Sequence, residues 1–132
     1  MNVMLKTSAF LIGTVVALAG NVSYAQTTQK FPVRPIRIIV PFTPGSASDL
    51  IARRVGSRMS ENWGQQVVVD NRAGAGGVVG MGIVATAAPN GYTLLVHSIG
   101  FAVSAALYSK LPFDPFRDFV PVSQIMASPS VV

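Results

Sequence analysis

After residue 30, the spacing between hydrophobic positions changes several times along the chain. Short apolar runs at Ile36 to Val40, Gln66 to Asp70 and Thr93 to His97 predict three buried strands. A weaker run at Val120 to Met126 predicts a fourth strand. Continuous apolar strands of this kind are typical of a parallel sheet that is covered on both faces.

Between the strands the apolar spacing becomes helical. Ser46 and Asp49 have the spacing of a helix start, a hydroxyl cap with a carboxylate three residues later. Gly64 stands where such a helix would end, and further helices are predicted over Gly77 to Ala88 and Phe101 to Tyr108. The first helix is predicted to be amphipathic with a basic outer face: its apolar positions are Ala47, Leu50, Ile51, Val55, Met59 and Trp63, and its outer positions are Arg53, Arg54, Ser57, Arg58 and Glu61.

The alternation of strands and helices predicts an α/β fold, in which ligands bind at the carboxyl ends of the strands. Three loops are expected there, over residues 41–49, 71–77 and 98–101. The first two pass through glycine into a helix start, where unpaired backbone N–H groups suit a carboxylate or a phosphate. Tight turning alone would explain the glycines of either loop, but the pair favours a small-anion site.

The first 25 residues have the pattern of a secretory signal peptide. Lys6 precedes an uncharged apolar run from Ala9 to Ala19, and the small residues Ser23 and Ala25 stand at −3 and −1 of a cleavage site. A membrane span would need about 20 apolar residues, and this run ends too early. We therefore expect export by the general secretory route, with residues 26–132 as the mature chain.

Composition narrows the classes of protein. The 132 residues suggest one domain, and a charged share of 11% with 50% hydrophobic residues excludes a charge-rich disordered chain. The absence of cysteine excludes disulfides, thiolate metal sites and a cysteine nucleophile, and one histidine excludes a histidine-rich zinc site. No metal and no cofactor are expected. The net charge of +5 includes three helix arginines without interleaved aromatic residues, so no nucleic-acid partner is expected either.

Two more specific motifs, one for dinucleotide binding and one for hydrolase catalysis, are only partly present. Gly74 and Gly76 begin a dinucleotide-binding pattern, but position 79 is valine. Ser98 and Gly100 form half of a hydrolase elbow whose base would have to be the adjacent His97, which a strand turns to the opposite face. We expect His97 to pack in a pocket wall and no enzymatic activity. Asp49 can cap its helix, fix its loop or contact an amino group of a ligand.

Four motifs in order resemble those of the tripartite tricarboxylate transporter receptors, also called Bug-type periplasmic binding proteins. They are the run from Ile36 to Gly45 with Asp49, the run from Val67 to Gly77, the run from Pro89 to Leu95, and Leu111 to Pro115 with Asp118, Phe119 and Pro121 to Ser123. The similarity extends over about residues 31–132, the whole expected mature chain.

The resemblance implies the parallel-sheet lobe of a type II periplasmic binding protein, a two-domain Venus-flytrap receptor. Such receptors bind small carboxylates and pass them to a membrane permease of a tripartite transporter. Carried onto this chain, the ligand-binding residues are Phe42, Pro44, Gly45, Ser46, Ala47, Ser48 and Asp49 in the first loop, Gly74, Ala75 and Gly76 in the second, and His97 and Ser98 in the third. Small residues are usual in the family where His97 stands, so the bulky ring changes the expected ligand size.

Members of the family are much longer than 132 residues. We therefore expect residues 26–132 to be the N-terminal part of ligand-binding domain 1, an incomplete first domain without the second. Two alternatives stay open, a small exported α/β hydrolase and a truncated product without a function.

Overall fold

The computed structural model describes residues 30–127, so the expected signal peptide and its cleavage site lie outside the described residues. The chain divides into residues 1–30 and residues 31–132, and the elements below all belong to the second unit. Among residues 30–127 no helix is both long and apolar enough to cross a bilayer.

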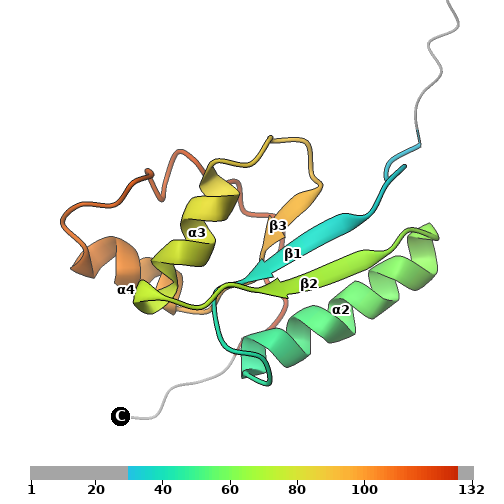
Figure 1. The fold of residues 1–132 in the computed structure, drawn as a ribbon, viewed down its shortest axis with the longest axis horizontal. Helices are drawn as coiled ribbons and strands as arrows, with labels where there is room; N and C mark the ends of the chain where they lie inside the picture. Colours follow the sequence, from blue (N-terminus) through green and yellow to red (C-terminus); the bar gives the residue numbers. More distant parts are fainter. Residues whose placement is uncertain (1–29, 128–132) are drawn as a thin grey trace, which may run out of the picture. The chain divides into compact units, whose positions relative to one another are not determined.

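A parallel sheet of three strands forms the centre of this unit (Figure 1). The strands β1 (Ile36–Val40), β2 (Val67–Asn71) and β3 (Thr93–Leu95) lie in the order β2-β1-β3. Ile36 is aligned with Val67 in one pair of strands, and Arg37 with Thr93 in the other. All three predicted strands and their parallel arrangement are confirmed: β1 has the predicted ends, and those of β2 and β3 differ by one or two residues.

The central strand β1 forms the core because it has a neighbour on both sides. Ile38 and Val40 are fully buried and pack with Ala52 of α2 (Ala47–Trp63). Gly56 of the same helix lies directly over the sheet, since a Cβ atom there would come within 3.2 Å of Val67 Cγ1. Close contact between α2 and the sheet therefore depends on the small residues of the helix.

Helix α3 (Val78–Ala85) crosses from β2 over β1 to β3, and helix α4 (Gly100–Leu107) follows β3. Parallel strands are connected by right-handed crossovers. Helix α2 leads from β1 to β2, whereas α3 leads back across the sheet from β2 to β3, so the two helices cover opposite faces of the sheet. This is the doubly wound arrangement, and the chain changes direction between β1 and β3. Ligands of such folds bind at that point, outside the carboxyl ends of the strands.

The predicted amphipathic helix is confirmed, but its buried stripe is displaced from the apolar positions. Asp49, Ala52 and Gly56 are the buried residues of α2, whereas Leu50 is 61% exposed. The five outer positions predicted from their polarity are all exposed. The helix begins after Ser46, whose Oγ accepts the N–H of Asp49 at 3.3 Å, and Gly64 ends it with φ 64°.

The prediction of a fourth strand at residues 120–126 is wrong for this structure. These residues form neither helix nor strand, and all of them are exposed. A strand needs a hydrogen-bonded neighbour, and within residues 30–127 none lies alongside this segment. Its apolar sequence is typical of a strand, but the sheet formed by the described residues does not reach this segment.

Candidate functional site

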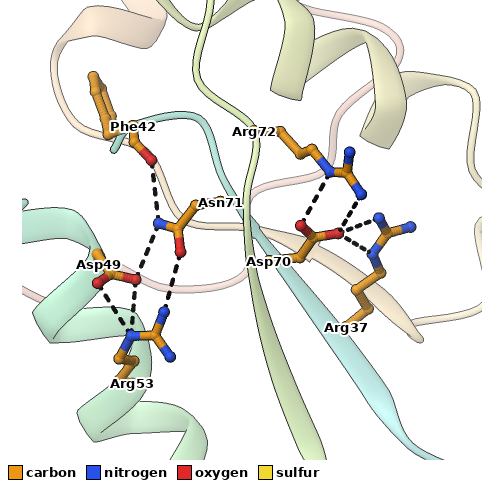
Figure 2. A network of polar contacts seen from close by, with 7 residues as sticks. All are labelled: Arg37, Phe42, Asp49, Arg53, Asp70, Asn71 and Arg72. Carbon is orange, nitrogen blue, oxygen red and sulfur yellow. Dashed lines mark hydrogen bonds and ion pairs between the residues drawn. The ribbon is translucent and has the colours of Figure 1, made fainter. Parts of the chain in front are cut away.

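The polar centre of the site is the buried carboxylate of Asp49, which is 2% exposed. Its Oδ2 accepts the N–H of Gly45 at 2.8 Å. Oδ2 also accepts Nε–H of Arg53 at 3.1 Å, and Oδ1 accepts Nδ2–H of Asn71 at 3.0 Å (Figure 2). Of the roles left open for Asp49, the contact with Gly45 supports the second: this side chain fixes the first loop.

Asn71 joins this network to the loop and to the helix. Its amide group donates to the carbonyl oxygen of Phe42 at 3.1 Å, and its Oδ1 accepts from Arg53 at 3.1 Å. Asn71 binds the beginning of the loop that follows β1 at Phe42, as Figure 2 shows, and Asp49 binds its end at Gly45. The loop is therefore held in place by contacts within the chain.

The hydrogen bond from Arg53 is the largest influence on the Asp49 carboxyl and, with that from Gly45, lowers its pKa to about 2, although burial opposes the shift. Asp49 is thus ionised at neutral pH, and its two oxygens are committed to partners within the chain. An acid held in this way is unsuited to proton transfer, and it stabilises the loop instead.

Asp70 precedes Asn71 and points to the opposite face of the sheet, as alternation along a strand requires. It pairs with Arg37 and with Arg72, whose Nε lies 3.0 Å from Oδ1 (Figure 2). Hydrogen bonding to Arg37, ahead of that to Arg72, lowers the pKa of Asp70 despite partial burial. Arg72 is the sole arginine in the three predicted loops, and in the described structure it forms an ion pair with Asp70 of β2.

A shallow hollow of about 240 Å³ lies between the first and second loops. Phe42 and Thr43 line one side, and the residues from Ala73 to Gly77 line the other. Within residues 30–127, the backbone N–H groups of Ala75 and Gly76 have no hydrogen-bond acceptor. Ser104 of α4 supports this loop from behind, because its buried hydroxyl donates to the carbonyl oxygen of Gly76 at 3.0 Å.

A second hollow, of about 530 Å³, lies between the start of α2 and the loop after β3. Ala47 and Ser48 line it from the helix, and His97 and Ser98 line it from the loop. As the first residues of a helix, Ala47 and Ser48 have N–H groups without intrahelical acceptors, and the described part of the chain offers them no other. Among residues 30–127, no lysine or arginine lines either hollow.

His97 stands in the wall of the second hollow, between two aromatic rings. The Phe42 ring lies 5.1 Å and the Phe101 ring 5.8 Å from the imidazole, both edge-on. Nδ1 accepts the N–H of Ser98 at 2.9 Å. Nε2 is buried beside Gly77, and among the described residues it has no hydrogen-bond partner. Burial lowers the pKa of His97, which keeps the ring neutral at pH 7.

Absence of a side chain at Gly77 makes room for this ring. A Cβ atom there would lie 2.7 Å from Nε2, and the residue has φ 101°, a conformation that L side chains rarely adopt. The expectation that His97 packs in a pocket wall agrees with this geometry. The hydrolase alternative is not favoured, because the nearest partner of Ser98 Oγ is the N–H of Gly100 at 3.4 Å, and no contact joins it to the imidazole.

The structure thus divides the predicted site residues among three places. Phe42, Gly74, Ala75 and Gly76 line the first hollow, and Ala47, Ser48, His97 and Ser98 line the second. Pro44, Gly45, Ser46 and Asp49 belong to the loop and the helix start that separate the two hollows.

Sequence reasoning missed three residues that hold the site together: Asn71, Arg53 and Ser104. Asn71 and Ser104 act on loops 29 and 28 positions away, so no local spacing could have identified them. The sequence predicts Arg53 on the outer face of its helix; the side chain is indeed 52% exposed, and its guanidinium pairs with Asp49. The i,i+4 spacing of Asp49 and Arg53 was a usable signal.

Comparison with known proteins identifies the family. The sequence profile of the tripartite tricarboxylate transporter family receptors matches residues 51–132. A UPF0065 protein of a Pseudomonas species, encoded between tcbD and tcbE, is 47% identical over 122 residues, which are 92% of this chain and 36% of the relative. Protein BugT of Bordetella pertussis is 41% identical over 124 residues, 92% of this chain and 38% of BugT.

Solved structures give the same result. The structure of MatC from Rhodopseudomonas palustris with bound malate has a TM-score of 0.65 and 40% identity, over 70% of this chain and 32% of MatC. The periplasmic binding protein BugD has a TM-score of 0.64 and 38% identity, over 67% of this chain and 30% of BugD. A further protein of R. palustris, with adipate, has a TM-score of 0.62 and 34% identity, over 65% of this chain and 29% of that one.

This chain spans between a third and two fifths of the length of the two relatives named above. The profile match covers more than half of its residues, and the order of its strands and loops agrees with the predicted parallel-sheet lobe. The chain belongs to the tripartite tricarboxylate transporter receptor family.

Proposed function

We propose that this chain contributes one wall of a receptor site for small carboxylates, rather than an enzyme active site. The observation that carries the proposal is the set of unpaired N–H groups at Ala47, Ser48, Ala75 and Gly76 beside the two hollows. They surround the carboxyl ends of the strands, where ligands of doubly wound folds bind. Relatives solved with malate and with adipate support a ligand of this class.

Backbone groups, and not an arginine clamp, hold the anion in this proposal. Arg72 is paired with Asp70, and Arg53 with Asp49. The partial positive charge at the start of α2 and the exposed N–H groups of the second loop provide the attraction instead. Side chains determine which acid fits, and His97 with Phe42 reduces the space beside the first loop.

In the proposed setting the protein works in the periplasm after removal of residues 1–25 and delivers its ligand to a membrane permease. Residues 26–132 form the N-terminal part of the first ligand-binding domain. One lobe makes about half of the contacts of a closed flytrap site and leaves its N–H groups facing solvent, where screening weakens them. The chain by itself is then expected to bind carboxylates weakly. N-terminal sequencing of exported protein should begin at Gln26.

The experiment is a titration of ¹⁵N-labelled residues 26–132 with malate, adipate and citrate, followed by NMR chemical shifts. This length contains the compact unit of residues 31–132. We expect the amide signals of Ala47, Ser48, Ala75 and Gly76 to shift with each acid, and the signal of Gly91 to stay in place. Succinamide, which carries no charge, serves as the ligand control. Shifts confined to arginine side chains would contradict the proposal.

Two matched glycine variants separate binding from folding. Gly45 and Gly64 have φ of 82° and 64°, and a Cβ atom at either would meet nothing within 4 Å. Gly45→Val and Gly64→Val therefore strain the two ends of the same helix in the same way. We expect Gly45→Val to weaken the acid-induced shifts and Gly64→Val to leave them unchanged. If Arg72→Ala abolished binding while Gly45→Val did not, the backbone assignment would be wrong.

A further inference from the structure

The imidazole of His97 has one ring nitrogen with partners and one without. Nδ1 lies 2.9 Å from the amide nitrogen of Ser98 and 3.1 Å from the carbonyl oxygen of the same residue. It can therefore accept a hydrogen bond in the neutral ring and donate one in the protonated ring. Nε2 is buried, and within residues 30–127 it has no partner in either state. Buried polar atoms without a hydrogen bond are rare in native proteins and call for an explanation.

The slot that holds Nε2 is unsuited to a charged ring. Nε2 lies beside Gly77, the N-cap of α3, where the start of the helix carries partial positive charge. The rings of Phe42 and Phe101, which flank the imidazole, are apolar. A protonated ring in this slot would bury a positive charge and an unpaired N–H group, which costs far more than burying the neutral ring. Protonation therefore favours a position of the ring outside the slot.

Charged groups of the neighbouring elements do not compensate for this cost. The sequences of α3, of α4 and of residues 123–127 contain no charged residue. On α2 and β2 the acids are already paired, Asp49 with Arg53 and Asp70 with Arg72. The phenol of Tyr108 lies against the second loop. Burial is accordingly the main cause that lowers the pKa of His97.

The hollow of about 530 Å³ offers the protonated ring another position. His97 already lines this hollow, together with Ala47 and Ser48 at the start of α2. Those two residues present backbone N–H groups that suit a carboxylate. No lysine or arginine of the described chain lines the hollow, so an imidazolium there would be its cationic side chain. A hydrogen bond between a cation and a carboxylate is stronger than one between neutral groups.

We propose that His97 couples the binding of a carboxylate to the binding of a proton. The neutral ring stays in the slot beside Gly77, whereas the protonated ring turns into the second hollow and pairs with the bound carboxylate. This inference rests on the proposed function, because it needs a carboxylate in that hollow. The proton and the carboxylate stabilise the same position of the ring, so each raises the affinity for the other. Ligand binding then takes up no more than the one proton that the imidazole gains.

The test follows the imidazole directly, since His97 is the one histidine of the chain and its NMR signal is unambiguous. Labelled residues 26–132 are titrated between pH 8 and pH 4.5, with and without saturating malate. We expect malate to raise the midpoint of the His97 titration by at least about 0.5 pH units, which corresponds to at least about threefold higher affinity of the protonated form. The amide shifts of Ala47 and Ser48 measure the affinity at each pH. In His97→Gln the ring cannot titrate, so any pH dependence that persists belongs to malate itself.

The outcomes separate this proposal from the receptor site on which it rests. If the amides of Ala47 and Ser48 respond to malate while the His97 midpoint stays unchanged, the coupling is overturned and the carboxylate site stands. If these amides respond at no pH, both are overturned. A midpoint that malate lowers would show that ligand binding favours the neutral ring, which contradicts the coupling.

Two glycine variants test the slot in the absence of ligand. A Cβ atom at Gly77 would lie 2.7 Å from Nε2, and one at Gly74 would lie 2.9 Å from Cγ2 of Val79. Both glycines have positive φ, 101° and 146°, so either alanine strains the second loop, but of the two only Gly77→Ala displaces the imidazole. We expect Gly77→Ala to raise the His97 midpoint towards about 6.5, the value of a solvated imidazole, and Gly74→Ala to leave it in place. Equal midpoints in the two variants would contradict the role of the slot. If Gly77→Ala does not fold, the malate comparison in the unsubstituted chain decides.

Discussion

The loop after β1 and the loop after β3 both lead into a helix at the same end of the sheet, but they are held in different ways. Asp49 binds the N–H of Gly45, and Asn71 binds the carbonyl oxygen of Phe42, so side chains fix the first loop at both ends. In the other loop, His97 is held by edge-on contacts with Phe42 and Phe101, and its Nε2 has no partner among the described residues.

This difference indicates a division of work between the two loops. Hydrogen bonds have defined lengths and directions, so the first loop offers its N–H groups in a fixed geometry. Edge-on aromatic contacts tolerate a range of distances, so in the proposed receptor site the other loop can adjust its wall to a carboxylate. Fixed donors beside an adjustable wall suit receptors that share one anion chemistry and differ in ligand size.

The largest expected effect comes from Asp49→Ala. It removes the acceptor of Gly45, Arg53 and Asn71 together and leaves a buried amide group and a guanidinium without their partner. We expect the largest fall in Tm of this series, measured by circular dichroism. Glu61→Ala is the control, since its pairing with Arg58 lies on the exposed side of α2 and contributes little. Equal falls would show that Asp49 does not organise the loop.

Asn71→Ala should have the next largest effect. It leaves the Phe42 carbonyl oxygen without its donor and Asp49 with one donor fewer. An unsatisfied buried polar group costs about 1–3 kcal/mol, which urea unfolding can measure. Asn90→Ala, which loses one exposed turn contact to the N–H of Tyr92, is the matched control. A loss no larger than that of the control would contradict the role assigned to Asn71.

Two serine variants compare the helix starts directly. Ser46 accepts the N–H of Asp49 at 3.3 Å in a well-formed cap, so Ser46→Ala should cost about 1 kcal/mol. Ser98 accepts the N–H of Gly100 at 3.4 Å, next to a residue that already has helical dihedral angles. The N-cap of α4 is Ile99, which has no side-chain cap bond, so we expect Ser98→Ala to cost about 0.5 kcal/mol, the low end for a single hydrogen bond. The reverse order in urea unfolding would show that the second loop is the better fixed.

The smallest effect expected is a pH dependence that belongs to the second loop. Burial lowers the pKa of His97 in the folded chain, so the unfolded chain binds a proton first as the pH falls. Stability from this residue is complete above about pH 6.5 and is lost as the pH falls through the lower folded value. Unfolding measured between pH 7 and pH 5 should show this loss, and His97→Gln should remove it. An unchanged slope in the variant would assign the loss to another group.

Residues whose partners lie nearby in the sequence could be predicted without a structure. The start of α2 at Ser46 and its end at Gly64 depend on caps within a few positions, and both predictions are confirmed. The three strands were identified by their own apolar composition. Their parallel pairing followed from the helices between them, because parallel strands need such crossovers.

Predictions failed where the deciding contact is distant or outside the described residues. The burial of Asp49 and the exposure of Leu50 depend on which face of α2 contacts the sheet. Asp49 faces the sheet, where it accepts a hydrogen bond from Asn71 of β2. The apolar segment at residues 120–126 has no neighbouring strand within the described part of the chain, and a strand cannot form on composition alone. The ligand-binding roles of the twelve candidate residues stay predictions.

The central position of β1 has a consequence for the order in which the protein can form. During synthesis β1 emerges before either neighbour, and its partners at Val67 and Thr93 follow only after intervening helices. An apolar strand that waits for both of its neighbours is exposed to other chains in the meantime. Slow emergence of the chain would lengthen that interval, so a chaperone that covers residues 36–40 until Leu95 has appeared would raise the yield of folded protein.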